Sequence, residues 1–122
     1  IVADTSFKLK KTLVAAAINK FEGQISTWKR ENNIYPCFRC LFPNKPNNRE
    51  NMNCSSNGVI GSLGGFLGSL QATEVLKEIL GIGESLAGYI NLYDLLNNNF
   101  RKIKINVDPC CSFCSKYRRK KD

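Results

Sequence analysis

Two cysteine pairs are the part of this sequence best equipped for chemistry. Each pair has the spacing Cys-x-x-Cys, and together they comprise Cys37, Cys40, Cys111 and Cys114. A Cys-x-x-Cys turn presents two sulfurs to one ion, and four thiolates complete a tetrahedral zinc site. The two pairs therefore predict a single structural zinc ion held by these residues.

Other uses of the same cysteines remain open at this point. Cys110 could replace Cys111 as a ligand, although only Cys111 keeps the two-residue spacing to Cys114. Reduced, buried thiols or a disulfide would need no metal at all. A thioredoxin-like redox role fits less well, because that motif should open a helix after a strand. The first pair instead runs into the sequence LFPNKP, which does not look helical.

Catalysis must come from elsewhere in the chain, because a four-thiolate zinc site has no open position for water or substrate. The chain has no histidine, which excludes serine–histidine and cysteine–histidine nucleophile systems within it. It also has no glycine-rich phosphate-binding motif. Cys54 lies in a long Asn-rich loop, residues 44–57, and is the candidate reactive thiol. An inert loop cysteine is the alternative reading of Cys54.

Hydrophobic periodicity predicts the elements that must position these cysteines. Residues 4–11 have the character of a helix end, and the apolar run 12–19 predicts a central buried strand. Residues 21–29 alternate and predict the next strand. Residues 59–81 carry apolar side chains at helical spacing and end on a glycine, which predicts a long helix with a buried first half.

The C-terminal part completes the predicted fold. Residues 89–96 and 100–107 flank three asparagines and predict an antiparallel hairpin with one dry and one wet face. Four glycines in the long helix cost helix stability, which is reasonable only where another backbone packs against them. These are Gly61, Gly64, Gly65 and Gly68. The elements together predict an α/β fold with a mixed sheet, one long central helix and a C-terminal hairpin, closed by a four-cysteine zinc clamp.

Length and charge indicate one ordinary domain. The chain has 122 residues, 43% of them hydrophobic, and a net charge of +8. We predict a domain over residues 1–115, followed by a solvated basic tail, residues 116–122, for which contact with nucleic acid is the less favoured alternative. The longest apolar stretch, residues 58–70, is shorter than the ~20 residues that cross a bilayer, and the first residues show no signal-peptide pattern. We therefore expect a cytoplasmic protein, in which paired cysteines stay reduced and favour metal.

Five segments of the chain carry a family resemblance. They are KTLVAAAINKFEGQIS, PCFRCLFP, CSSNGVIGSLGGFLGSLQATEVLKEILGIGESLAGYINLYDLL, FRKIKI and DPCCSFC, in that order. Together they resemble the C-terminal half of the MoeB/ThiF/HesA adenylyltransferases, relatives of the ubiquitin-activating enzymes. The resemblance covers nearly the whole chain, from Asp4 to Cys114.

The resemblance implies a partial Rossmann-like activating-enzyme fold. Full-length members use ATP and magnesium to adenylate the C-terminal glycine of a ubiquitin-like sulfur carrier, and they commonly form homodimers. Many hold one zinc through two Cys-x-x-Cys pairs, which match the two pairs of this chain. A cysteine of the family's crossover loop matches Cys54, and in some members it forms a covalent link with the carrier or takes part in sulfur transfer.

The family's ATP-binding residues have no counterpart among the residues matched here, and Asp4 is not the family's magnesium ligand. We therefore expect the chain to be the zinc-binding, carrier-docking half of such an enzyme and to be inactive alone. We also expect it to associate with itself or with a missing N-terminal half, because the strand at 12–19 needs neighbours on both edges. A zinc-stapled module that binds protein or nucleic acid is the alternative. The sequence does not distinguish a molybdopterin pathway from a thiamine pathway.

Overall fold

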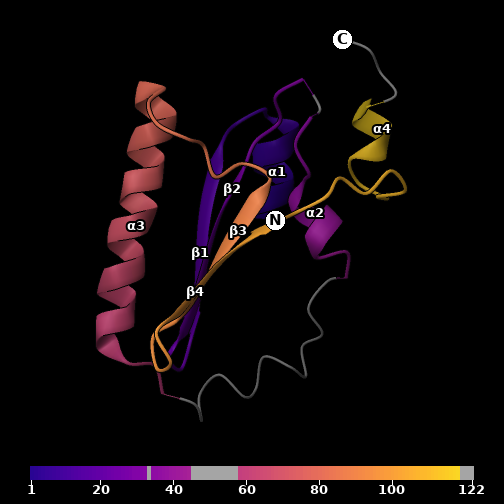
Figure 1. Ribbon diagram of the computed structural model, residues 1–122. Coiled ribbons are helices and arrows are strands. Elements are labelled where there is room, and N and C mark those ends of the chain that lie inside the picture. The colour runs from indigo at the N-terminus through magenta and orange to yellow at the C-terminus, as the bar shows by residue number, and fades with distance from the viewer. Residues whose placement is uncertain (33, 45–57, 119–122) are drawn as a thin grey trace.

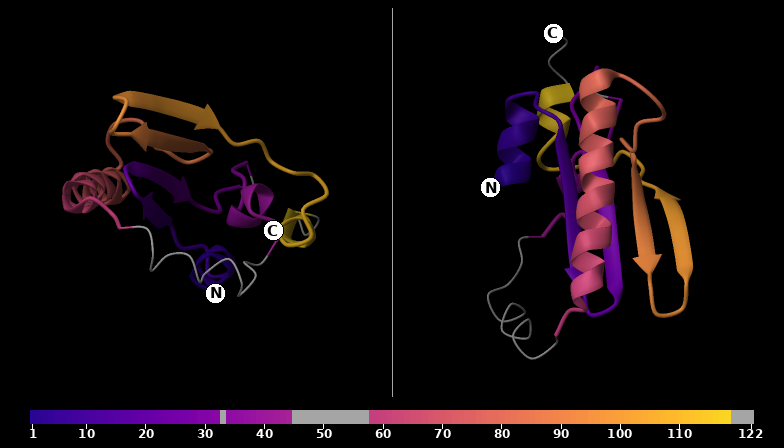
Figure 2. Two further views of the ribbon diagram at one scale, coloured as in Figure 1. Left: turned by 90° about the horizontal axis from the view of Figure 1, so that it is seen from below. Right: turned by 90° about the vertical axis from the view of Figure 1, so that its left-hand side faces the viewer.

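A four-stranded sheet is the centre of the computed structural model, which describes residues 1–32, 34–44 and 58–118. The strands lie in the order β1-β2-β3-β4 and comprise β1 (Leu13–Asn19), β2 (Glu22–Trp28), β3 (Tyr89–Asp94) and β4 (Asn99–Lys104). The long helix α3 (Gly61–Leu80) covers one face of the sheet (Figure 1). The short helices α1 (Val2–Lys8), α2 (Phe38–Leu41) and α4 (Ser115–Arg118) lie on the other side of the sheet (Figure 2).

The pairing of the strands corrects the predicted mixed sheet. All three pairings between the named strands are antiparallel, and the described parallel contact is an isolated bridge between Thr27 and Ala87. Within the described residues β1 pairs only with β2, so the predicted central strand is an edge strand. Its last four residues are exposed. A run of small apolar side chains shows that a strand can be buried, but it does not show whether a neighbour is present.

Helix α3 packs on the sheet through two leucines. Leu63 and Leu67 are 0% and 2% exposed, and both side chains lie close to Gly23 of β2. The Leu67 side chain occupies the space beside Gly23, where a Cβ atom would clash with it. The helix ends as predicted at Gly81, which has a left-handed φ of 64° and donates its N–H to the Lys77 carbonyl.

The rest of α3 is more exposed than the sequence predicted. Phe66, Leu76 and Ile79 are 36%, 56% and 73% exposed. A Cβ atom added at any of the four glycines in the first half of the helix would meet no described atom within 4 Å. The predicted close packing of a backbone against these glycines is therefore wrong for the described residues. An apolar first half does not reveal which of its faces meets the sheet.

The predicted C-terminal hairpin is confirmed. β3 and β4 pair in register from Tyr89 opposite Lys104 to Asp94 opposite Asn99. The Asp94 carboxylate accepts the backbone N–H groups of Leu96 and Asn97 and so closes the turn. The predicted dry face holds only in part, because all of β4 is exposed at the edge of the sheet and the first buried residue comes after it, at Ile105.

A second apolar cluster lies on the sheet face opposite α3. Trp28, Ile90 and Ile105 form its buried centre, and Phe38 of α2 packs against it. The rings of Trp28 and Phe38 meet edge to face with centroids 5.3 Å apart. This contact attaches α2 to the end of β2, and it places the first cysteine pair beside the segment that follows β4. No helix among the described residues is both long enough and apolar enough to cross a membrane.

Candidate metal centre

The predicted cysteine pairs meet at one end of the sheet. The Sγ atoms of Cys37, Cys40, Cys111 and Cys114 all lie within 4.8 Å of one another. The Cys37 Sγ atom is 3.7 Å from those of Cys40 and Cys111, and the Cys40 and Cys114 Sγ atoms are 3.6 Å apart. Thiols that are 74 residues apart in sequence are therefore nearest neighbours in space.

These separations fit a tetrahedral metal site. A Zn–S bond of about 2.3 Å places the sulfurs of a tetrahedron about 3.8 Å apart. The sulfurs are too far apart for a disulfide bond of about 2.05 Å, and the described cysteines are all free. Cys110 is exposed and lies outside the cluster, so Cys111 is the member that completes it, in agreement with its spacing.

Burial makes two of these thiols hard to ionise. It raises the pKa of Cys37 far above its ordinary value, and Cys40, Cys111 and Cys114 add to that effect. It also raises the pKa of Cys114 to about 11, where Cys40 and Cys111 add to the effect and Cys37 opposes it. Burial also opposes ionisation of Cys111, but backbone N–H groups of Cys114 and Phe113 donate to its sulfur and lower its pKa overall. A divalent cation that displaced the four protons would offset two of the four thiolate charges and leave the cluster with a net charge of −2. Four soft sulfur donors favour zinc over magnesium or calcium for that role.

Short helical turns hold the two pairs. Cys37 is the N-cap of α2, and its carbonyl accepts the N–H of Cys40 at 2.9 Å. The Cys111 carbonyl likewise accepts the N–H of Ser115 at 3.2 Å, at the start of α4. The short helix α2 around the first pair was not predicted, whereas residues 42–44, which follow it, are not helical, as the sequence indicated. Both helices are four residues long, which is too short for a periodic signal in the sequence.

Two predicted features lie partly or wholly outside the described residues. Cys54 and residues 45–57 are outside them, so the reactivity of that thiol stays a prediction. Of the predicted basic tail only residues 116–118 are described. They lie in α4, where the Tyr117 ring packs on Phe113 with centroids 5.7 Å apart. The domain boundary at residue 115 also stays a prediction.

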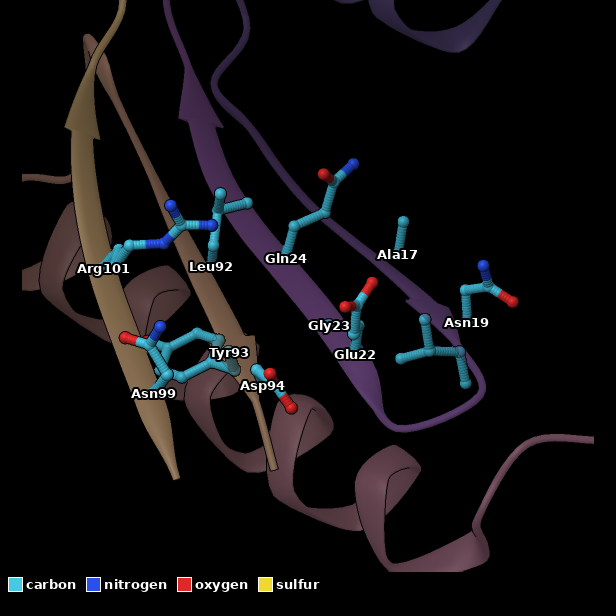
Figure 3. A pocket seen from close by; sticks show the side chains of 11 residues that line it. Ala17, Asn19, Glu22, Gly23, Gln24, Leu92, Tyr93, Asp94, Asn99 and Arg101 are labelled. Atoms are coloured by element: carbon cyan, nitrogen blue, oxygen red, sulfur yellow. The ribbon is translucent and has the colours of Figure 1, made fainter. Parts of the chain in front are cut away.

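A polar hollow of about 350 Å³ lies at the other end of the same sheet face. Its walls include two rows of side chains that cross all four strands in register: Asn19, Glu22, Asp94 and Asn99, then Ala17, Gln24, Leu92 and Arg101. Figure 3 shows these side chains on the near face of the sheet, with α3 behind it. Sequence reasoning missed this site. Its residues come from four strands, and the only local signal is the EGQ segment that begins at Glu22.

The sheet, the covering helix and the cysteine cluster define the class of this protein. Residues 1–113 match the model of the ThiF family. The chain belongs to the ThiF family, and the family resemblance inferred from the sequence is confirmed.

Relatives and solved structures agree with this assignment. The sulfur carrier protein adenylyltransferase of Thermus thermophilus is 41% identical over 117 residues, which are 93% of this chain and 43% of the relative. The adenylyltransferase and sulfurtransferase MOCS3 of Xenopus laevis is 40% identical over 116 residues, 94% of this chain and 25% of that protein. The chain thus spans less than half the length of these relatives. The structure of E. coli MccB with ATP shares the fold, with a TM-score of 0.74, 14% identity, and coverage of 93% of this chain and 35% of that one.

Proposed function

We propose that this chain is the zinc-binding, carrier-docking half of an adenylyltransferase that acts on a ubiquitin-like sulfur carrier, and that it does not adenylate the carrier alone. The observation that carries the proposal is the cluster of four cysteine sulfurs within 4.8 Å, in a chain of the ThiF family. The relative from Thermus thermophilus is a sulfur carrier protein adenylyltransferase, which supports the substrate class.

The proposed zinc ion has a structural role. Four thiolates fill its coordination sphere and leave no position for a substrate. The ion joins α2, which is packed on Trp28, to the segment that follows β4. Both strands of the C-terminal hairpin would then be fixed relative to β2 at two points, the sheet hydrogen bonds and the metal.

The polar hollow is the proposed contact surface for the carrier. Gln24, Asn19 and Asn99 offer amide donors and acceptors there, and no ion pair of Arg101 is present among the described residues. An extended C-terminal segment of a carrier could lie across the strands and use these groups. Arg101 is the cation among the lining residues, which also include the carboxylates of Glu22 and Asp94, so an acidic group on the carrier would find its counter-charge at Arg101.

ATP and magnesium would bind elsewhere. The free edge of β1 is the proposed junction with an N-terminal half or with a second copy of the chain, because an unpaired strand edge readily accepts another strand. Such a partner would provide the phosphate-binding groups that the chain lacks. We also propose that the Cys54 thiol attacks the adenylated C-terminus of the carrier once the partner half has formed that adenylate, so that a thioester forms and AMP leaves. Cys54→Ala tests this step by loss of the covalent adduct on non-reducing gels.

The purified chain and a sulfur carrier provide the test. We expect about one zinc per chain, binding of the carrier, and no ATP–pyrophosphate exchange unless the N-terminal half of a relative is added. Arg101→Glu should weaken carrier binding at least about 10-fold, since it reverses the charge in the hollow. Lys104→Glu is the matched control, because it changes the same charge on the opposite face of the same strand. Equal binding by both variants would argue against docking at the hollow, and robust exchange by the chain alone would refute its inactivity.

A further inference from the structure

Helix α1 is anchored to the cysteine cluster and not to the core of the sheet. Phe7 is 7% exposed, and its buried neighbours are Cys37, Cys111 and Cys114. The apolar cluster of the sheet, around Trp28, is separate from this group. The position of α1 therefore depends on the cysteine pairs more than on any strand.

One anchor is an ion pair with the first cysteine pair. Arg39 lies between Cys37 and Cys40, and its guanidinium meets the Asp4 carboxylate in a two-point contact. The Nε–Oδ1 distance is 3.0 Å and the Nη2–Oδ2 distance is 2.9 Å. The two side chains are 17% and 24% exposed. A paired, partly buried arginine fork of this kind fixes the direction of both partners.

The other anchor is aromatic and involves the second cysteine pair. Phe7 packs against Phe113 and Tyr117, with ring centroids 5.6 Å and 5.9 Å apart. Phe113 directly precedes Cys114 in the sequence, so this packing helps to fix the position of the second cysteine pair. The Arg30 guanidinium covers the group, 5.5 Å from the Phe7 ring and 4.9 Å from the Tyr117 ring. Helix α1 thus contacts both halves of the cluster from one side.

We propose that Asp4 and Phe7 are outer-shell positioning residues of the metal centre, and that α1 stays docked only while a metal holds the two cysteine pairs together. The inference rests on the proposed zinc binding. Four thiolates around a divalent cation carry a net charge of −2, and Arg39 is placed to offset it. Asp4 acts through Arg39 by fixing its orientation, and Phe7 acts by packing on the second pair.

The coupling must work in both directions. If the metal strengthens the docking of α1 by some factor, α1 strengthens metal binding by the same factor. Removing a contact of α1 should therefore weaken zinc binding, and we expect the loss of affinity as faster release of zinc. Removing zinc should in turn speed hydrogen exchange at the α1 amides, such as those of Thr5 and Leu9, which donate within this segment.

Zinc release to a colorimetric chelator tests the first direction on the full chain. Phe7→Ala should speed release about 10-fold and Asp4→Asn several-fold, as expected for outer-shell residues of zinc sites. Thr5→Ala is the control, because Thr5 is on the exposed side of the same helix. Asp4→Asn should have no further effect in an Arg39→Gln background, because Asp4 acts through Arg39. Release at the wild-type rate in both α1 variants would overturn the proposal.

Hydrogen exchange before and after chelation tests the second direction. We expect faster exchange at the α1 amides and unchanged exchange in α3. Equal acceleration in both helices would overturn the selective coupling, because the metal would then support the whole fold. Failure to bind zinc or cobalt at all would overturn the proposed function as well. If the chain binds metal normally and both α1 variants release zinc at the wild-type rate, only this inference would be overturned.

Discussion

The two ends of the sheet face opposite α3 are built in opposite ways. At one end, buried thiols, aromatic rings and an ion pair satisfy one another within the chain. At the other end, the hollow presents polar side chains from four strands, most of them directed to solvent. Buried groups that contact one another within the chain generally stabilise the fold, whereas a concave surface with convergent polar groups is typical of a binding site. The contrast teaches that one sheet can separate the two tasks along its length.

The largest expected effect comes from replacing a cysteine of the cluster. Cys114→Ser should abolish stoichiometric zinc and lower the melting temperature by about 10 °C or more, since a loss of about 3 kcal/mol has that effect in a domain of this size. Metal analysis and thermal unfolding measure both quantities. Cys110→Ser is the control, because Cys110 is exposed and outside the cluster. Zinc content that survives Cys114→Ser would contradict the assignment of the ligands.

The second-largest expected effect is a loss of zinc affinity at the cysteine cluster when the pH is lowered. The raised pKa values of Cys37 and Cys114 mean that these thiols hold their protons near neutral pH, so a metal must displace them. Zinc affinity should therefore rise with pH, by about 10-fold per pH unit for each proton released, and fall as the pH drops from 8 to 6. A competition titration with a chelator of known affinity measures this slope. An affinity independent of pH would mean that the thiols are already ionised in the metal-free protein.

A pair of glycine substitutions sharpens the comparison at the junction of sheet and helix. Gly23→Ala should destabilise the fold by about 1–3 kcal/mol, because its Cβ would clash with Leu67. Gly65→Ala should stabilise it by up to about 1 kcal/mol, because that site is helical and open. Unfolding in denaturant measures the free energy of unfolding of each variant and so distinguishes a loss of stability from a gain. Destabilisation by Gly65→Ala would indicate that a partner, such as a second copy, packs closely on α3.

The smallest expected effect belongs to the hollow. Gln24→Ala should change the free energy of unfolding by no more than about 0.5 kcal/mol, as for other surface positions without a structural role. Unfolding in denaturant, with zinc content measured alongside, tests this. A larger loss of stability would show that the hollow supports the fold and would remove the distinction between the two ends.

The sequence predicted those features that depend on local spacing. Residue spacing singled out the four cysteines that the structure brings together, and helical periodicity with a terminal glycine placed α3 and its end at Gly81. Within the described residues β1 is an edge strand and not the predicted central strand, because a strand's neighbours are not encoded in its own residues. The hollow and the contact between Asp4 and Arg39 were missed for a related reason. Both consist of residues that are far apart in the sequence, and Asp4 and Arg39 are 35 residues apart. No short sequence motif predicts contacts of this kind.

The sulfur cluster also has a topological consequence. An ion bound between Cys40 and Cys114 would close a ring of chain that contains α3, β3 and β4. A cross-link over so long a ring lowers the entropy of the unfolded chain, as a disulfide does, and so raises the free energy of that state by an amount on the order of 4 kcal/mol in the simplest model. Unlike a disulfide, this link would resist reductants and open to chelators. The supply of free metal, and not the strength of the reductants in the surroundings, would then determine how long the ring stays closed.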